Sequence, residues 1–239
     1  MTVRIAMWSG PRNISTAMMR SWENRADCSV IDEPFYAAYL KRTQFRHPMF
    51  DEVLASQPND YQTVIEDLTK ALVETPLQYQ KHMTHHILEH DDLAWAADMK
   101  HCFLIRNPAY VISSYTNSMG HCSVDDIGII RQYEIYKRLS DNFSNPLPVI
   151  DTEKTLNNPM QTIKALCDVL NIKFDSAMLS WPAGKRDSDG VWAAHWYRSV
   201  EQSTGFSKPQ MRDVSLNAEQ QAVLEEVLPF YEALKRFCL

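Results

Sequence analysis

The chain opens, after two residues, with Val3-Arg4-Ile5-Ala6-Met7-Trp8-Ser9-Gly10-Pro11-Arg12-Asn13-Ile14-Ser15-Thr16. Its first part, Val3–Trp8, is a short apolar run that stops at Ser-Gly-Pro, a pattern typical of a buried strand. From Ser15 the apolar residues recur at helical spacing as far as about Asn24. The stretch therefore predicts a strand, a short loop and a helix in direct succession.

Similar units recur along the rest of the chain. Further short apolar runs predict strands at Cys28–Ile31, Leu77–Lys81, Cys102–Ile105 and Leu147–Ile150. Helical spacing follows at Tyr61–Glu74, after Asn107-Pro108, at Ile127–Leu139, at Pro159–Leu170 and from Asn217, with Pro229 expected to kink or end the last helix. Residues 41–62 are polar and mixed, and we expect a surface excursion there. Alternating strands and helices predict an α/β fold, a three-layer sandwich around a central parallel sheet, and we expect residues 1–239 to form one domain.

Composition narrows the range of functions. The 239 residues include only 6 glycines, and the formal net charge is −6, without a basic half or tail. A duplex nucleic-acid binder usually carries a basic patch, so we expect no nucleic-acid partner. No membrane span or secretory signal is visible, and the 5 cysteines form no CxxC pair. These features favour a cytoplasmic protein without a membrane partner.

The loop Ser9–Thr16 is a candidate anion site. Backbone N–H groups at a helix start have no partner within the helix, and the helix dipole adds partial positive charge there. Arg12 adds a cation, and Ser15 and Thr16 add hydroxyl donors, which together suit a phosphate or sulfate. The alternative is that Ser15 and Thr16 only cap a helix. Gly10 is the only glycine of this loop and no Lys-Ser/Thr pair follows, so a nucleotide site without a metal is favoured over a Mg-nucleotide phosphotransferase.

A second basic turn follows the strand Cys102–Ile105. Arg106 comes directly after this strand and just before the start of a helix, and Ser114 follows eight residues later. A guanidinium binds phosphate in a fork, and a serine hydroxyl can add a hydrogen bond. The alternative for Arg106 is a surface ion pair with a carboxylate.

Together the two turns resemble the sulfotransferase family that uses 3′-phosphoadenosine 5′-phosphosulfate (PAPS), in particular its bacterial sulfotransferase-like branch. Pro11–Thr16 is similar to the family's first motif, P-[KR]-S-G-[ST]-[ST], and Arg106 with Ser114 is similar to its second. The resemblance implies a P-loop nucleotide-binding fold and PAPS as the cosubstrate, with adenosine 3′,5′-bisphosphate as product and no metal. It gives Arg12 a catalytic role at the leaving phosphate and Arg106 and Ser114 the 3′-phosphate. The implied nucleotide-binding residues are Gly10, Pro11, Arg12, Asn13, Ser15, Thr16, Arg106 and Ser114.

The catalytic base has several candidates. Glu33 follows the predicted strand Cys28–Ile31, and the resemblance supports it because some relatives use a glutamate after this strand. His82 and His85 follow the strand Leu77–Lys81 in a segment that resembles the family's Lys-Thr-His, and histidine has a suitable pKa. The alternatives are a loop acid for Glu33, and a metal site or a solvated turn for the histidine-rich segment. The aromatic stretch Trp192–Tyr197 is either part of an acceptor pocket or part of the core.

These features predict a sulfotransferase that moves a sulfuryl group from PAPS to a hydroxyl or amine of a small-molecule acceptor. A P-loop small-molecule kinase and a non-catalytic nucleotide-binding relative remain as alternatives, the latter because Asn13-Ile14 replaces the family's Ser-Gly and Ala17 stands where many members carry tryptophan. We expect a monomer or a homodimer, with the acceptor pocket formed by the loops at residues 34–60, 82–95 and 185–205.

Overall fold

A five-stranded parallel sheet lies at the centre of the protein. The computed structural model describes residues 2–208 and 213–239. The strands are β1 (Val3–Ser9), β2 (Cys28–Asp32), β3 (Leu77–Met83), β4 (Lys100–Ile105) and β5 (Val149–Asp151). Their order in the sheet is β2-β3-β1-β4-β5, and every neighbouring pair is parallel. The parallel sheet and each of its predicted strands are thus confirmed.

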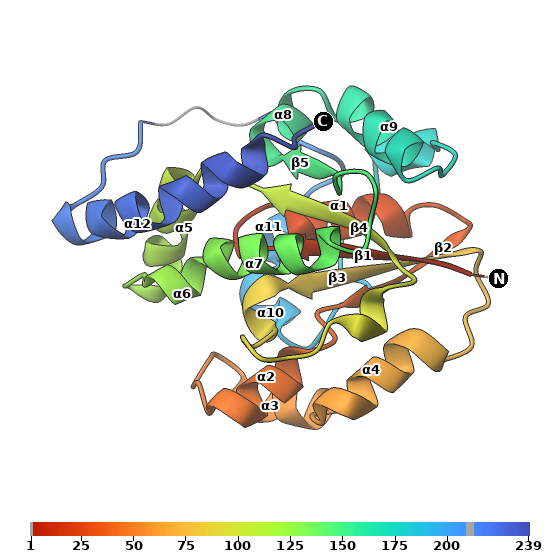
Figure 1. Ribbon diagram of the computed structural model, residues 1–239, viewed down its shortest axis with the longest axis horizontal. Helices are drawn as coiled ribbons and strands as arrows, with labels where there is room; N and C mark the ends of the chain where they lie inside the picture. The colour runs from red at the N-terminus through yellow and green to blue at the C-terminus, as the bar shows by residue number, and fades with distance from the viewer. Residues whose placement is uncertain (1, 209–212) are drawn as a thin grey trace.

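Helices cover both faces of this sheet, which confirms the three-layer α/β architecture. In Figure 1, α7 lies in front of the sheet and α1 behind it. The apolar residues of α1 and α9 pack on one face, and those of α4, α5, α7 and α12 on the other. The helices are α1 (Ser15–Glu23), α2 (Tyr36–Thr43), α3 (Phe50–Ser56), α4 (Tyr61–Lys70), α5 (Pro108–Met119), α6 (Val124–Ile127), α7 (Ile129–Ser140), α8 (Thr152–Asn157), α9 (Pro159–Val169), α10 (Ala193–Trp196), α11 (Arg198–Glu201) and α12 (Ala218–Lys235).

The two cores follow from the alternation of side chains along the strands. Successive side chains of a strand point to opposite faces of the sheet. In β1, Ile5 and Met7 lie in the core beneath α1, whereas Ala6 and Trp8 lie in the core beneath α7. All four are fully buried, which explains why this strand is a continuous apolar run.

Two segments differ from the sequence-based expectation. The polar region 41–62 contains α3, and its residues Phe50 and Val53 are buried against the core. Pro229 lies inside α12 and does not end it. Val227, Tyr231 and Leu234 are buried on either side of the proline, so tertiary packing holds the helix together despite the missing N–H.

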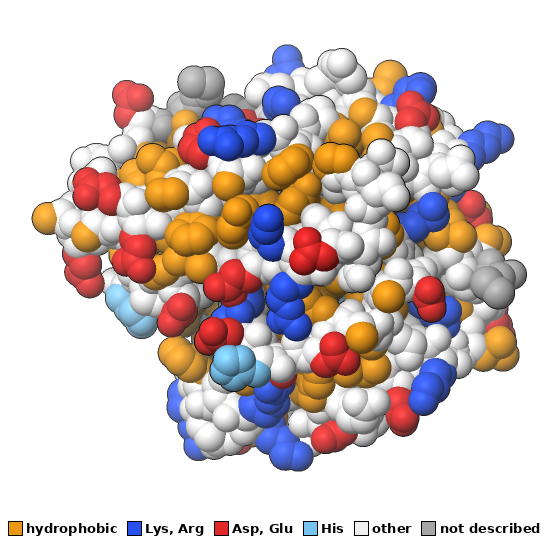
Figure 2. Space-filling view, viewed as in Figure 1, with side chains coloured by type: hydrophobic (Ala, Val, Ile, Leu, Met, Phe, Trp, Pro, Cys, Tyr) orange, Lys and Arg blue, Asp and Glu red, His pale blue; other side chains and the backbone are white. Residues whose placement is uncertain are grey.

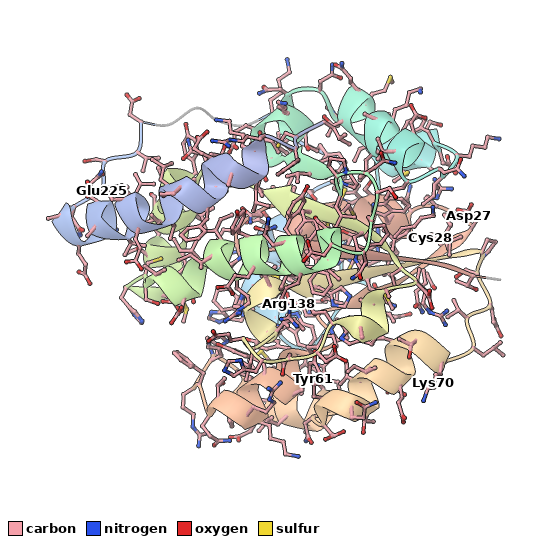
Figure 3. All side chains as sticks on the ribbon, in the orientation of Figure 1. Asp27, Cys28, Tyr61, Lys70, Arg138 and Glu225 are labelled. Carbon is pink, nitrogen blue, oxygen red and sulfur yellow. The ribbon has the colours of Figure 1, made fainter. Side chains whose placement is uncertain are left out.

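The surface in the view of Figure 2 carries acidic and basic side chains interspersed with apolar ones. The loop at Asp91 and Asp92 joins α4 to α7. Arg138 donates to the Asp91 carbonyl at 2.6 Å, and the Tyr61 hydroxyl donates to the Asp92 carbonyl at 3.1 Å (Figure 3). Among the described residues, no helix is both long and apolar enough to cross a lipid bilayer.

His82 lies in the core beneath α7. Its ring stacks on Trp8 at a centroid distance of 4.5 Å, and its Nε2 lies 3.1 Å from Gln80 Oε1. Trp8 Nε1 in turn donates to His101 Nδ1 at 3.1 Å, so His101 must be neutral to accept this bond. Burial lowers the pKa of His82 to about 3 and that of His101 to about 4. Both imidazoles are therefore uncharged parts of the core.

Because these histidines are buried and uncharged, we expect the folded protein to lose stability at acid pH. In the unfolded chain a histidine takes up a proton near pH 6.5, whereas the folded chain resists protonation down to the lowered pKa. The contribution of these histidines to the free energy of unfolding is therefore fully present above about pH 6.5. It decreases as the pH falls, by about 1.4 kcal/mol per pH unit for each such histidine. His82→Phe keeps the stacking ring but not the titration, so it should reduce this slope in urea unfolding measured between pH 6.5 and 4.5. His90→Gln, at an exposed histidine, should leave the slope as in wild type; an unchanged slope in His82→Phe would contradict the account.

Candidate active site

The carboxyl ends of the strands meet at one cavity of about 420 Å³. Parallel α/β sheets bind ligands at this edge because the loops that follow the strands converge there. The loop between β1 and α1 forms one wall, and the ends of β2 and β3 form the wall opposite. The lining residues on the first side include Pro11, Arg12, Asn13, Ile14, Ser15, Thr16, Ala17, Arg106 and Ser114, and those on the second include Glu33, Tyr36, His47, Lys81, His85, His86, Tyr115, Trp196 and Tyr197.

The loop between β1 and α1 has the geometry of an anion cradle. Arg12 and Ile14 adopt left-handed backbone conformations at φ 62° and 56°, and the intervening Asn13 does not. Alternation of this kind turns successive N–H groups toward one side of the chain. Asn13 Nδ2 donates to the Gly10 carbonyl at 3.2 Å and closes the loop. A Cβ at Gly10 would lie 2.3 Å from the Ile127 carbonyl oxygen, so this loop path requires glycine.

The start of α1 adds to this cradle. Its N-cap residue, Ile14, makes no side-chain capping bond. Within residues 2–208 and 213–239, the first N–H groups of the helix thus have no intrahelical or side-chain partner, and the positive end of the helix dipole lies behind them. Ser15 and Thr16 line the cavity at this point. The alternative that they act as capping residues does not fit, because they are the first residues of the helix itself.

The structure brings Arg12, Arg106 and Ser114 together, as predicted. Arg12 Nε donates to Ser114 Oγ at 2.8 Å, and Arg106 Nη1 donates to the Arg12 carbonyl at 2.9 Å. Arg106 also pairs with Glu153 at 3.1 Å, whereas Arg12 has no carboxylate partner among the described residues. Burial and the neighbouring Arg106 both lower the pKa of Arg12. An anion bound here would relieve the repulsion between the two cations.

Glu33 lies on the opposite wall, in a cluster of buried polar groups. Lys81 Nζ contacts Glu33 Oε1 at 2.5 Å, Asp32 Oδ1 at 2.8 Å and the Tyr197 hydroxyl at 2.6 Å. Burial raises the pKa of Glu33, and Lys81 opposes the rise. Burial alone would lower the pKa of Lys81, but the carboxylates of Asp32 and Glu33 raise it well above its ordinary value. The cluster thus holds a charged lysine between two acids.

The histidines of the third predicted loop separate from one another. His85 and His86 line the cavity, whereas His82 lies on the other face of β3 and does not reach it. His82 is thus not brought to the site with Glu33. Burial lowers the pKa of His85 to about 3. Burial also lowers the pKa of His86, whose ring stacks on Tyr36 at 4.6 Å.

His90 of the histidine-rich segment lies in an exposed turn, but the other three histidines are not solvated. His82 and His86 are buried, and His85 is half-buried. In residues 2–208 and 213–239, no group of three or more His, Cys, Asp or Glu side chains is arranged to hold a metal ion.

The aromatic stretch Trp192–Tyr197 divides between the core and the cavity lining. Trp192 is 2% exposed and packs in the core, whereas Trp196 and Tyr197 line the cavity. Lys81 is a cavity residue that the sequence analysis did not single out. The alternation of β3 carries a signal for Lys81, because a strand residue adjacent to a core histidine points to the other face.

Comparison with known proteins gives one family. A family model described as a sulfotransferase domain matches residues 3–238. Branched-chain-amino-acid aminotransferase-like proteins 1 and 2 of Arabidopsis thaliana are 36% and 34% identical over 231 residues. The match covers 97% of this chain but 41% of each relative, so the chain spans about two fifths of their length.

Solved structures agree with the fold. The sulfotransferase domain from the curacin biosynthetic pathway superposes with a TM-score of 0.57 at 17% identity, covering 95% of this chain and 98% of that one. A sulfotransferase from Alicyclobacillus acidocaldarius superposes with a TM-score of 0.56 at 12% identity, covering 100% of this chain and 98% of that one. At such identities the likeness shows the fold alone. Because the family match extends over nearly the whole chain, the protein belongs to the sulfotransferase domain family, whose general function is sulfuryl transfer.

Proposed function

We propose that this protein transfers a sulfuryl group from PAPS to a hydroxyl or amine of a small-molecule acceptor. The observation that carries the proposal is that one cavity is lined by a cationic wall and by a wall with a buried carboxylate. Arg12, Arg106 and Ser114 lie with a helix start on one wall, and the buried carboxylate of Glu33 lies on the other. The first wall fits a doubly phosphorylated nucleotide, because it offers two guanidinium groups and the unpaired N–H groups at a helix start.

Each residue has a role in this reaction. PAPS supplies an activated sulfuryl group on a phosphate leaving group. Arg12 balances the negative charge that develops on the leaving phosphate oxygen as the S–O bond breaks. Ser15 and Thr16 orient the 5′ end, and Arg106 with Ser114 holds the 3′-phosphate. Glu33 accepts the proton that the acceptor's O–H or N–H loses as its new bond to sulfur forms.

We assign the base to Glu33 over His85. Burial raises the pKa of Glu33, which makes its carboxylate a stronger base. Burial lowers the pKa of His85 to about 3, so its imidazole holds a proton weakly. Both side chains line the cavity, so their basicity and not their access to the acceptor decides between them.

The acceptor side of the cavity favours a neutral or cationic acceptor. Its lysine, Lys81, is already paired with two carboxylates. Burial lowers the pKa of His47, His85 and His86, so these imidazoles are uncharged at neutral pH. An acceptor bearing a carboxylate or phosphate would therefore find no free cation among the described residues of this wall.

We also propose a cytoplasmic location and a monomer or homodimer without a nucleic-acid partner. All five cysteines are free, and four of them are buried, which suits a reducing compartment. The aminotransferase-like name belongs to relatives more than twice as long as this chain, and we assign no aminotransferase activity to the matched region.

Adenosine 3′,5′-bisphosphate should raise the melting temperature. A ligand that binds only the folded state at a hundred times its Kd adds about 2.7 kcal/mol of stability, which corresponds to roughly 5–10 °C for a chain of this size. Arg106→Ala should abolish the shift because it removes a phosphate ligand. Lys185→Ala, at an exposed cation outside the cavity, should keep it. No shift in wild type at millimolar bisphosphate would refute the proposed nucleotide site.

Glu33→Gln should reduce sulfuryl transfer by about 10²–10⁴-fold, because the amide cannot accept the acceptor's proton. The measurement is the release of ³⁵S-labelled product from labelled PAPS with a panel of hydroxyl and amine acceptors. The bisphosphate shift should persist in this variant, since Glu33 lies on the other wall. His85→Gln should retain most of the activity. The opposite pattern, with His85→Gln inactive and Glu33→Gln active, would move the base to His85. Binding of bisphosphate without transfer to any acceptor in wild type would identify a non-catalytic relative.

A further inference from the structure

The ammonium group of Lys81 has no hydrogen-bonding capacity left for a ligand. A lysine ammonium donates three hydrogen bonds, and its three acceptors here are Asp32 Oδ1 at 2.8 Å, Glu33 Oε1 at 2.5 Å and the Tyr197 hydroxyl at 2.6 Å. The side chain is only 1% exposed. Lys81 borders the cavity, but its charge is directed into the protein.

Glu33, in contrast, is only half engaged. Its Oε1 accepts from Lys81, and in the described part of the chain no hydrogen bond involves its Oε2. The residue lines the cavity, and Oε2 is not among the buried oxygens that lack a partner. One oxygen of the carboxylate is thus anchored while the other is left for a ligand.

The backbone of Glu33 is fixed in an unfavourable conformation. Its φ of 43° lies in the left-handed region, which residues with a side chain rarely adopt. The Glu33 N–H donates to the Lys81 carbonyl at 3.0 Å, and the Glu33 carbonyl accepts from the Tyr36 N–H at 3.0 Å. Such strain persists only where surrounding contacts enforce it, and it is common at functional sites.

Tyr197 links this cluster to the cavity wall at the end of α10. Its hydroxyl lies 2.7 Å from Asp32 Oδ2, to which it donates, and it accepts from Lys81 and from Trp192 Nε1. Asp32 Oδ2 also accepts from the Gly190 N–H at 3.2 Å. Asp32 and Tyr197 therefore use their polar atoms within the protein and hold Lys81 in place.

We propose that Lys81 is a positioning residue for Glu33: its ammonium, held by Asp32 and Tyr197, anchors Oε1 and directs Oε2 to the acceptor. The inference rests on the proposed function, because it takes Glu33 as the base. When the acceptor oxygen or nitrogen bonds to sulfur, its proton passes to Oε2, and the leaving phosphate keeps the electron pair of the broken S–O bond. Lys81 remains protonated throughout and acts only through Glu33.

The test requires a variant that removes the anchor without burying two unpaired carboxylates. Lys81→Met combined with Asp32→Asn meets this need, because Glu33 is then the only acid of the cluster and can take up a proton. Asp32→Asn alone is the matched control, since it keeps the Lys81–Glu33 pair. The readout is the titration of the Glu33 carboxyl carbon by ¹³C NMR in glutamate-labelled protein, assigned by its loss in Glu33→Gln.

In the double variant the Glu33 midpoint should lie at least about one pH unit above the control, because Lys81 no longer opposes the effect of burial. With an acceptor that is sulfated, the acidic limb of the pH–rate profile should move to higher pH by the same amount. A folded double variant with an unchanged midpoint would overturn the proposal. Adenosine 3′,5′-bisphosphate should raise the melting temperature equally in both variants, because neither substitution touches the nucleotide wall. If wild type fails to bind the bisphosphate, that result counts against the proposed function and not against the anchoring of Glu33.

A second measurement needs no folded double variant. In the wild-type protein, a buried ammonium with three hydrogen bonds exchanges its protons slowly, so Lys81 should give a resolved ¹⁵N-attached NζH₃ signal at neutral pH. This signal should shift in Glu33→Gln. A Lys81 ammonium that exchanges rapidly, or one whose signal is unaffected by Glu33→Gln, would also overturn the proposal.

Discussion

The buried ammonium of Lys81 is the contact on which the cavity depends. It joins the ends of β2 and β3 to Tyr197, far along the chain, and its charge offsets the two carboxylates of Asp32 and Glu33. An isolated buried charge is strongly unfavourable, and removal of one partner from a buried pair typically costs about 3–5 kcal/mol. Lys81 thus supplies the charge partner that both carboxylates need at this depth.

The sheet places this cluster opposite a site of the reverse charge. The β1 and β4 ends carry Arg12 and Arg106, and the β2 and β3 ends carry the acids with their lysine. Because the strands are parallel, these ends open on one cavity, which is lined by Arg12 and Arg106 and also by Glu33 and Lys81. One wall thus suits a leaving phosphate and the other a proton acceptor, which is the division of labour that group transfer requires. The local charges achieve this in a chain whose net charge is −6.

Much of the architecture could be predicted because it depends on local patterns. The apolar runs of the strands and the helical spacing between them were sufficient to predict the parallel sheet. Arg12, Arg106 and Ser114 could be brought together because they follow strands whose ends must meet. The roles of these residues toward a nucleotide stay predictions. The helix α3 was missed because only two of its residues are buried and the segment around them is polar. The helix α12 continues through Pro229 because packing against distant residues compensates the lost hydrogen bond.

The composition of the acid cluster could not be predicted in the same way. Tyr197 reaches Lys81 across 116 positions, a long-range contact with no local signal. His82 was grouped with His85 because they are close in sequence, but it lies on the face of β3 opposite to Lys81 and packs on Trp8. The alternation of β3 separates the two faces, yet only the structure shows which face meets the cavity.

The central claim is that the two walls hold a nucleotide and an acceptor in one cavity, and a crystal structure with adenosine 3′,5′-bisphosphate tests it most directly. The account predicts the 5′-phosphate on the Gly10–Thr16 loop, the 3′-phosphate between Arg106 and Ser114, and an open space between Arg12 and Glu33. A bisphosphate bound elsewhere, or one whose phosphates occupy the Glu33 wall, would contradict it.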